Sequence, residues 1–175
     1  MRIYAAFVKN PSKIMIGARA IEWAEKIDFS HTAIILEDND GLIEVYESVW
    51  PKSRKMPMSE WLCHYRLKHL YKFDVSDENK FSEMKQFLND RIGVFYSVWQ
   101  LVVIGLTFIA PLEKLLTGRV VNGSKRLICT ELVGDFFIKF FDCKWFEPTD
   151  TISLTETKDE IVRKWKEQNG SISDT

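Results

Sequence analysis

Two short apolar runs separated by an Asp-Gly step constrain the fold of this chain more than any other feature of its sequence. The runs cover residues 30–36 (SHTAIIL) and 42–48 (LIEVYES), and both contain the β-branched and aromatic residues that favour strands. Residues 37–41 (EDNDG) separate them and end on a dipeptide typical of tight hairpin turns. The sequence therefore predicts an antiparallel β-hairpin in its N-terminal third.

The spacing of apolar residues elsewhere predicts further strands and several helices. Residues 2–8 and 67–75 have β-like patterns, and residues 77–92 form a predicted helix that is capped by Ser76 or Asp77. Helical spacing also covers residues 14–26, 127–141 and 156–168. Together these elements predict an α+β fold in which a small antiparallel sheet packs against helices.

The length and composition are those of one ordinary globular domain. The chain has 175 residues, of which 46% are hydrophobic, and its 12 Phe and 6 Trp predict a bulky core. We expect a single domain over residues 1–168 and a flexible tail at residues 169–175. In this tail the Gly, Ser and Asp residues cannot bury enough apolar surface to fix the chain.

The charge and the cysteine content limit the partners and the location. A net charge of −1 argues against non-specific binding of nucleic acid, which needs a basic surface. The cysteines are Cys63, Cys129 and Cys143, and this odd, widely spaced set indicates no disulfide framework. We therefore expect a reducing, cytoplasmic location.

Cys129 lies where the helical pattern of residues 127–141 begins, so its thiol is expected in or before the first turn. At that place the unpaired backbone N–H groups and the helix dipole favour the reactive thiolate over the thiol. The same N–H groups can hold the oxyanion of a tetrahedral intermediate. The alternative is a small buried apolar residue, which is the role of most lone cysteines.

His31 and Glu47 form the candidate base and its acidic partner. His31 begins the first hairpin strand, and on the second strand Glu47 shares a face with the apolar residues Ile43 and Val45. A carboxylate on an apolar face is costly without a partner, and a histidine on the neighbouring strand would supply one. Such a carboxylate would fix the imidazole tautomer and stabilise its cation. Glu44 is the second candidate for the acidic role, and a solvated carboxylate at the hairpin edge is the alternative for Glu47.

A zinc site built from Cys63, His64 and His69 is a further alternative. The spacing of these residues matches no established metal pattern, so neither a metal nor an organic cofactor is expected. His64 and His69 are instead interpreted as surface residues, because the segment around them is polar.

The run from Val94 to Ala110 has no charged residue and is nearly long enough to cross a bilayer. Polar residues interrupt it, among them Ser97, Gln100 and Thr107. We therefore interpret this run as a buried helix. A helix that contacts lipid or membrane is the alternative, which is not favoured.

Five segments together resemble a known family. In chain order they are residues 30–34 (SHTAI), 45–48 (VYES), 93–96 (GVFY), 128–133 (ICTELV) and 146–150 (FEPTD). Their order and spacing resemble those of the permuted NlpC/P60 papain-like cysteine hydrolases of the YiiX/YebB-like group. In that group a histidine and an acidic residue precede the cysteine, which is the reverse of the order in papain.

The resemblance implies a circularly permuted papain-like (NlpC/P60) fold and a role for each matching residue. Cys129 would be the nucleophile, His31 the base and Glu47 the acid that orients the histidine. Tyr96 and Thr130 would contact the substrate. The implied activity is cysteine-dependent hydrolysis of an amide bond through an acyl-enzyme, on a peptide-like substrate such as one derived from the cell wall.

Two other functions remain open. The first is a lipid acyltransferase or thioesterase similar to lecithin:retinol acyltransferase. Those enzymes typically carry a second histidine and an Asn-Cys-Glu-His type motif, where this chain has Glu47 and residues 128–131 (ICTE). The second is a papain-like module of a bacterium or phage that binds a partner without catalysis.

Overall fold

A computed structural model gives the placement of residues 1–10, 22, 26–96, 126–144 and 153–170. At its centre is a five-stranded sheet with the strand order β4-β3-β2-β1-β5. The strands are β1 (Arg2–Lys9), β2 (His31–Glu37), β3 (Ile43–Glu47), β4 (Arg54–Pro57) and β5 (Arg66–Asp74), and all neighbours pair antiparallel. A small second sheet pairs β6 (Phe95–Tyr96) parallel to β7 (Arg126–Leu127).

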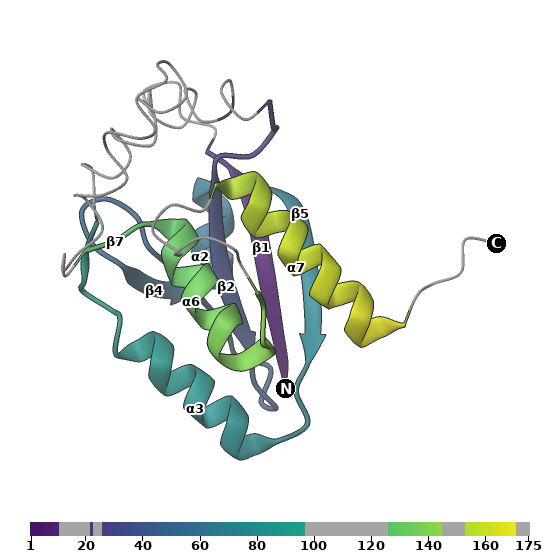
Figure 1. Cartoon of the computed structure of the whole chain (residues 1–175). Coiled ribbons are helices and arrows are strands. Elements are labelled where there is room, and N and C mark those ends of the chain that lie inside the picture. The colour runs from purple at the N-terminus through teal and green to yellow at the C-terminus, as the bar shows by residue number, and fades with distance from the viewer. Residues whose placement is uncertain (11–21, 23–25, 97–125, 145–152, 171–175) are drawn as a thin grey trace.

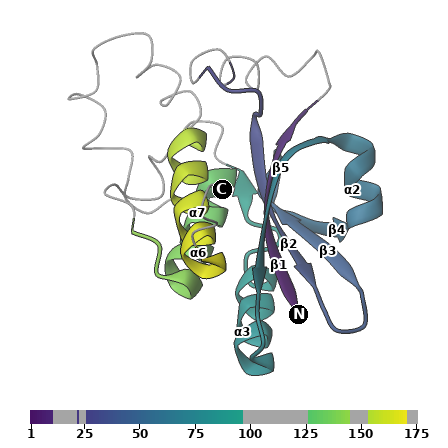
Figure 2. The same ribbon diagram turned by 90° about the vertical axis from the view of Figure 1, so that its right-hand side faces the viewer.

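Helices cover both sides of the five-stranded sheet. They are α2 (Met58–His64), α3 (Glu78–Asn89), α6 (Cys129–Phe141) and α7 (Leu154–Asn169). Figure 1 shows α6 in front of the sheet, with α7 and α3 to either side of it. In the view turned by 90°, α6 and α7 lie on one side of the sheet and α2 lies on the other (Figure 2). Helix α3 buries its apolar residues in the same cluster as α6 and α7. The predicted α+β class, with its small antiparallel sheet packed against helices, is confirmed.

The predicted hairpin is also confirmed. Residues 34–37 of β2 pair antiparallel with residues 43–46 of β3. Between the strands Gly41 has a φ of +78°, which favours glycine, and the Asp38 carboxylate accepts a hydrogen bond from the backbone N–H of Leu42 at 2.9 Å. The local chemistry of this turn sets the register of the two strands.

Each face of the sheet buries its own apolar cluster, because successive side chains of a strand point to opposite faces. The cluster beneath α3, α6 and α7 includes Phe7, Phe73, Met84, Phe136 and Phe137. The cluster beneath α2 consists of Ala6, Val8, Ala33, Ile35, Val45, Met56, Trp61 and Tyr65. The many aromatic rings of the first cluster confirm the bulky core expected from the composition.

The predicted helices differ from the observed ones at their ends. Helix α3 ends at Asn89 instead of Ile92, and the Asp77 side chain caps it by accepting hydrogen bonds from two backbone N–H groups. Helix α7 begins at Leu154, because Ser153 and Glu156 form a capping box. Helix α6 begins at Cys129, two residues later than predicted, since the residues before it belong to β7 and the N-cap.

The helix predicted for residues 94–110 is wrong at its start, where β6 is found. Gly93 has a φ of +83° and turns the chain, and the backbone N–H of Tyr96 then donates to the carbonyl of Pro51 at 2.9 Å. Backbone pairing with neighbouring segments thus outweighs the weak local preference of an apolar run for a helix. Residues 97–110 lie outside the described residues. Of the helices that the structure describes, none has the length and apolar character needed to cross a membrane.

Strand β4 and helix α2 are absent from the sequence-based expectation, which assigns no helix or strand between residues 48 and 67. Pro57 ends β4 and is also the N-cap of α2, with a φ of −62° that suits the start of a helix. The proline therefore joins two elements. The expected helix at residues 14–26 and the expected tail at 169–175 lie largely outside the described residues.

We predict that Phe136→Ala lowers the free energy of unfolding by about 3–5 kcal/mol, because its fully buried ring packs between α6 and α3 against Phe87. Urea denaturation followed by circular dichroism measures this loss. The matched control is Ile138→Ala on the same helix. Its side chain is 41% exposed, so the substitution will cost less than about 1 kcal/mol. Equal losses from the two variants would contradict the orientation of α6.

Candidate active site

Glu47, the last residue of β3, holds His31, the first residue of β2, through a buried hydrogen bond. His31 Nε2 lies 2.8 Å from Glu47 Oε2. His31 is 8% exposed and Glu47 is fully buried. The predicted pairing of the histidine with a carboxylate on the neighbouring strand is therefore present in the structure.

The remaining contacts of Glu47 come from two elements that sequence analysis missed. Trp61 Nε1, on α2, donates to Glu47 Oε2 at 3.0 Å. Arg54, on β4, approaches Glu47 Oε1 with Nε at 2.8 Å and Nη2 at 2.7 Å. Burial alone would raise the pKa of Glu47, but the hydrogen bonds from His31, Trp61 and Arg54 outweigh it and lower this pKa to about 2. Glu47 is thus an anion at physiological pH.

Tyr65 fixes the imidazole ring from the side of α2. Its ring stacks on His31 with 5.3 Å between ring centroids and an interplanar angle of 23°. The ring of Trp61 lies 5.2 Å from that of Tyr65, so both aromatic residues restrict the movement of the histidine.

Two sequence signals point to the missed residues. Arg54 lies directly opposite Glu47 in the β3–β4 pairing, which a second hairpin prediction would have revealed. Trp61 and Tyr65 have the i, i+4 spacing of one helix face.

Cys129 is the first residue of α6, so its thiol lies in the first helical turn as the sequence predicts. The thiol adjoins the His31 imidazole closely enough to contribute to the raised pKa of that ring. Because Glu47 engages Nε2 at 2.8 Å, Nδ1 is the ring nitrogen left for a cysteine partner. Cys129 itself is only 6% exposed. The Glu131 side chain supports this turn by accepting a hydrogen bond from the backbone N–H of Ile128 at 2.7 Å.

The surroundings of His31 favour the charged form of its imidazole. Burial alone would lower the pKa of His31, but the hydrogen bonds to Cys129 and Glu47, together with the negative charge of these groups, raise it to about 10. The site therefore places an imidazolium between a carboxylate and a cysteine sulfur at the start of a helix. This arrangement can hold a thiolate and can donate a proton to a group bound beside it.

The structure also places the other predicted site residues. Tyr96, on β6, is half-buried, and its pKa is raised well above the usual range by burial and then by the charges of Cys129 and Glu131. Thr130 follows Cys129 in α6 and is buried. Glu44 lies on the other face of the sheet, where it pairs with lysines, so of the two candidate acids Glu47 is the one that contacts His31.

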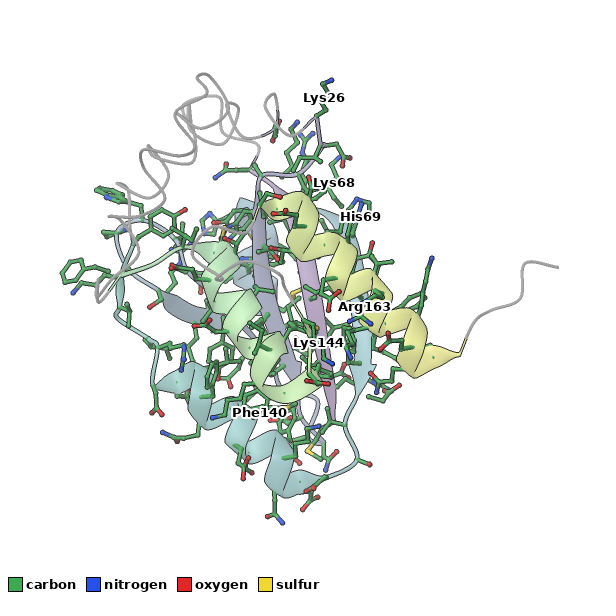
Figure 3. The ribbon with its side chains drawn as sticks, viewed as in Figure 1. Lys26, Lys68, His69, Phe140, Lys144 and Arg163 are labelled. Carbon is green, nitrogen blue, oxygen red and sulfur yellow. The ribbon has the colours of Figure 1, made fainter. Side chains whose placement is uncertain are left out.

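The residues considered for a zinc site do not come together. Cys63 and His64 are exposed on α2. His69 lies on β5 near Lys68 (Figure 3), and its ring packs edge-to-face with Phe29 in the cluster on the opposite side of the sheet. Among the residues that the structure describes, no three His, Cys, Asp or Glu side chains are grouped so that they could hold a metal ion.

A surface cavity of about 680 Å³ lies at the opposite end of α6 from Cys129. Phe140, which marks that end of the helix in Figure 3, is one of its lining residues. The charged residues of its lining are Asp74, Asp77, Lys80, Lys139, Asp142, Lys164 and Glu167. Since both signs of charge are present in similar number, this cavity favours no charged ligand, and it is separate from the candidate site.

Comparison with known proteins supports the fold. No family model matches the sequence, and no match is found among curated proteins. Among solved structures, the chain is similar to the crystal structure of the metalloprotein YiiX from Escherichia coli O157:H7, a member of the DUF1105 group. The TM-score is 0.54 at 15% sequence identity, over 97% of this chain and 82% of the other. The chain thus has a YiiX-like fold, which confirms that part of the predicted resemblance.

The two perturbed pKa values predict how stability depends on pH. The lowered pKa of Glu47 adds stability that is present above its ordinary value of 4.5 and is lost as the pH falls towards about 2. The raised pKa of His31 adds stability that is present below its ordinary value of 6.5 and is lost as the pH rises through about 10. The pair therefore contributes most between pH 4.5 and 6.5.

We predict that Glu47→Gln costs on the order of 3 kcal/mol at a pH of about 5.5, because it leaves buried groups without their anion. Urea denaturation at several pH values measures this loss, which will shrink towards both acid and alkaline pH. In the control, Glu44→Gln removes a partly exposed pair and will cost no more than about 1 kcal/mol. A loss for Glu47→Gln that does not vary with pH would contradict the charged pair.

Proposed function

We propose that the chain is a cysteine-dependent amide hydrolase, with Cys129 as nucleophile, His31 as acid and base, and Glu47 as the residue that orients His31. The observation that carries this proposal is the single imidazole that is hydrogen-bonded to the buried Glu47 carboxylate, at 2.8 Å, and adjoins the Cys129 thiol, which raises its pKa. In this proposal the YiiX-like fold is a circularly permuted papain-like (NlpC/P60) fold.

The reaction follows from the charges of the site. The Cys129 thiolate attacks the carbonyl carbon of the amide, and the free backbone N–H groups at the start of α6 stabilise the oxyanion. His31 donates its proton to the leaving nitrogen as the C–N bond breaks, which leaves a thioester on Cys129 and a neutral imidazole. The neutral imidazole then takes a proton from water, whose oxygen attacks the thioester. This step releases the acid and restores the charged pair.

An inert role for Cys129 fits these contacts less well. A structural cysteine needs only apolar neighbours, whereas this one adjoins a buried cation that is itself held by a buried anion. Burying charges costs several kcal/mol per ion unless each is well paired. A reactive thiolate gives such an arrangement a purpose, since catalytic sites are where perturbed groups gather.

The YiiX structure is described as that of a metalloprotein. The residues of the candidate site do not suit a metal ion. Both Glu47 oxygens already accept hydrogen bonds, and the guanidinium of Arg54 beside them would repel a metal cation. The proposed reaction therefore uses no metal and no other cofactor.

An acyltransferase or thioesterase would form the same thioester and differ only in the acceptor. The other two histidines of the chain, His64 and His69, lie away from Cys129, so the second histidine typical of the lecithin:retinol acyltransferase type is absent from the site. This difference favours a peptide-like substrate. All three cysteines are free thiols, and a reducing compartment such as the cytoplasm would keep Cys129 in the form that the proposal needs.

The pH dependence of alkylation by iodoacetamide tests the proposal. Peptide mass spectrometry will show that the rate at Cys129 stays high as the pH falls below about 8.5, where an ordinary cysteine loses its reactive form. In His31→Ala the rate at a pH of about 6.5 will fall at least about tenfold, because the stabilising cation is gone.

Cys63, which is exposed, supplies the comparison profile in the same sample. His69→Ala is the matched histidine control and will leave the rate at Cys129 unchanged. If the profile of Cys129 follows that of Cys63, or if His31→Ala has no effect, the catalytic assignment is wrong and a binding module becomes the better interpretation.

A further inference from the structure

Two buried side-chain oxygens in the described part of the chain have no hydrogen-bond partner, and both lie next to the proposed catalytic residues. They are Ser30 Oγ and Thr130 Oγ1. Ser30 directly precedes His31, and Thr130 directly follows Cys129. The two residues are 7% and 4% exposed.

Unpaired buried hydroxyl groups are costly. Each loses about 1–3 kcal/mol of hydration without a compensating bond, and the large majority of buried polar groups in proteins are paired. Other buried hydroxyls of this chain follow that rule. Thr32 Oγ1 donates to the carbonyl of Ala6 at 3.0 Å, and Thr157 Oγ1 donates to that of Ser153 at 2.8 Å. The two exceptions flank the reactive pair, so a bound substrate is the natural partner for them.

The positions of the two hydroxyls agree with this interpretation. Thr130 is in the first turn of α6, the part of a helix whose backbone N–H groups have no intrahelical partner. Ser30 directly precedes β2, and successive side chains of an extended chain point to opposite faces. The Ser30 side chain therefore lies on the opposite face to His31, towards the face of the sheet that packs against α6. Cys129, which directly precedes Thr130, is itself only 6% exposed.

We propose that these hydroxyls bind the acyl part of the substrate, with Thr130 donating to the scissile carbonyl oxygen and Ser30 bonding to a neighbouring amide. This inference rests on the proposed function and deepens it. A simple fatty acyl group has one polar oxygen at the reacting end and would satisfy one hydroxyl. A peptide-like acyl group carries a second amide close by and would satisfy both.

Acylation by activated esters tests this assignment, because it passes through a tetrahedral oxyanion whereas alkylation by iodoacetamide does not. The probes are p-nitrophenyl acetate and the p-nitrophenyl ester of N-acetylglycine, which carries the additional amide. Release of p-nitrophenolate gives the rate in a single turnover, and peptide mass spectrometry locates the thioester on Cys129.

Thr130→Val keeps the shape of the side chain but removes the hydroxyl. It will slow acylation by both esters about 100-fold, as loss of one oxyanion donor does in other hydrolases, and will leave alkylation of Cys129 unchanged. Thr130→Ser retains a hydroxyl and will restore most of the rate. Thr157→Val, the control at another buried threonine, will leave acylation unaffected.

Ser30→Ala will slow acylation by the N-acetylglycine ester about tenfold and will leave acylation by the acetate ester unchanged. Unaltered acylation in Thr130→Val, or an equal loss of alkylation, would overturn the role of Thr130. An equal effect of Ser30→Ala on both esters would overturn the peptide-like assignment. Failure of the unmodified protein to form a thioester at Cys129 would instead refute the proposed function itself, and the inference with it.

Discussion

The carboxylate of Glu47 is fully buried, and three elements besides its own strand supply the groups that compensate its charge. His31 comes from β2, Arg54 from β4 and Trp61 from α2. Removal of this one anion would leave a cation, a guanidinium and an indole N–H without their acceptor. The positions of β4 and α2 relative to the hairpin therefore depend on the same interaction that orients the imidazole.

The aromatic core on the other face of the sheet places the nucleophile. Phe136 and Phe137 of α6 are fully buried among rings from β5 and α3, so the helix is fixed on the sheet along its length. Its first residue, Cys129, consequently lies beside His31 at the start of β2. A site that joins the two faces in this way needs both clusters intact, which links the stability of the fold to the chemistry of the thiol.

Local rules explain what the sequence could predict. The turn at Gly41 sets the hairpin, the two-residue period selects Glu47 over Glu44, and the helical pattern puts Cys129 in a first turn. The missing parts depend on contacts between distant segments. Helix α2 is only seven residues long and follows a proline, while β6 and β7 have two residues each, so none of these elements has a periodic pattern that could reveal it. Arg54 and Trp61 gain their role only from the register of β4 and the packing of α2.

A double-mutant cycle on the alkylation rate of Cys129 at neutral pH tests most directly whether Glu47 acts through His31. The four proteins are the unmodified chain, Glu47→Gln, His31→Ala and the double variant. If the carboxylate acts only by holding the imidazolium, Glu47→Gln will slow alkylation, and the double variant will be no slower than His31→Ala alone. Losses that multiply in the double variant would show that the two residues act independently, and would contradict the site as it is described.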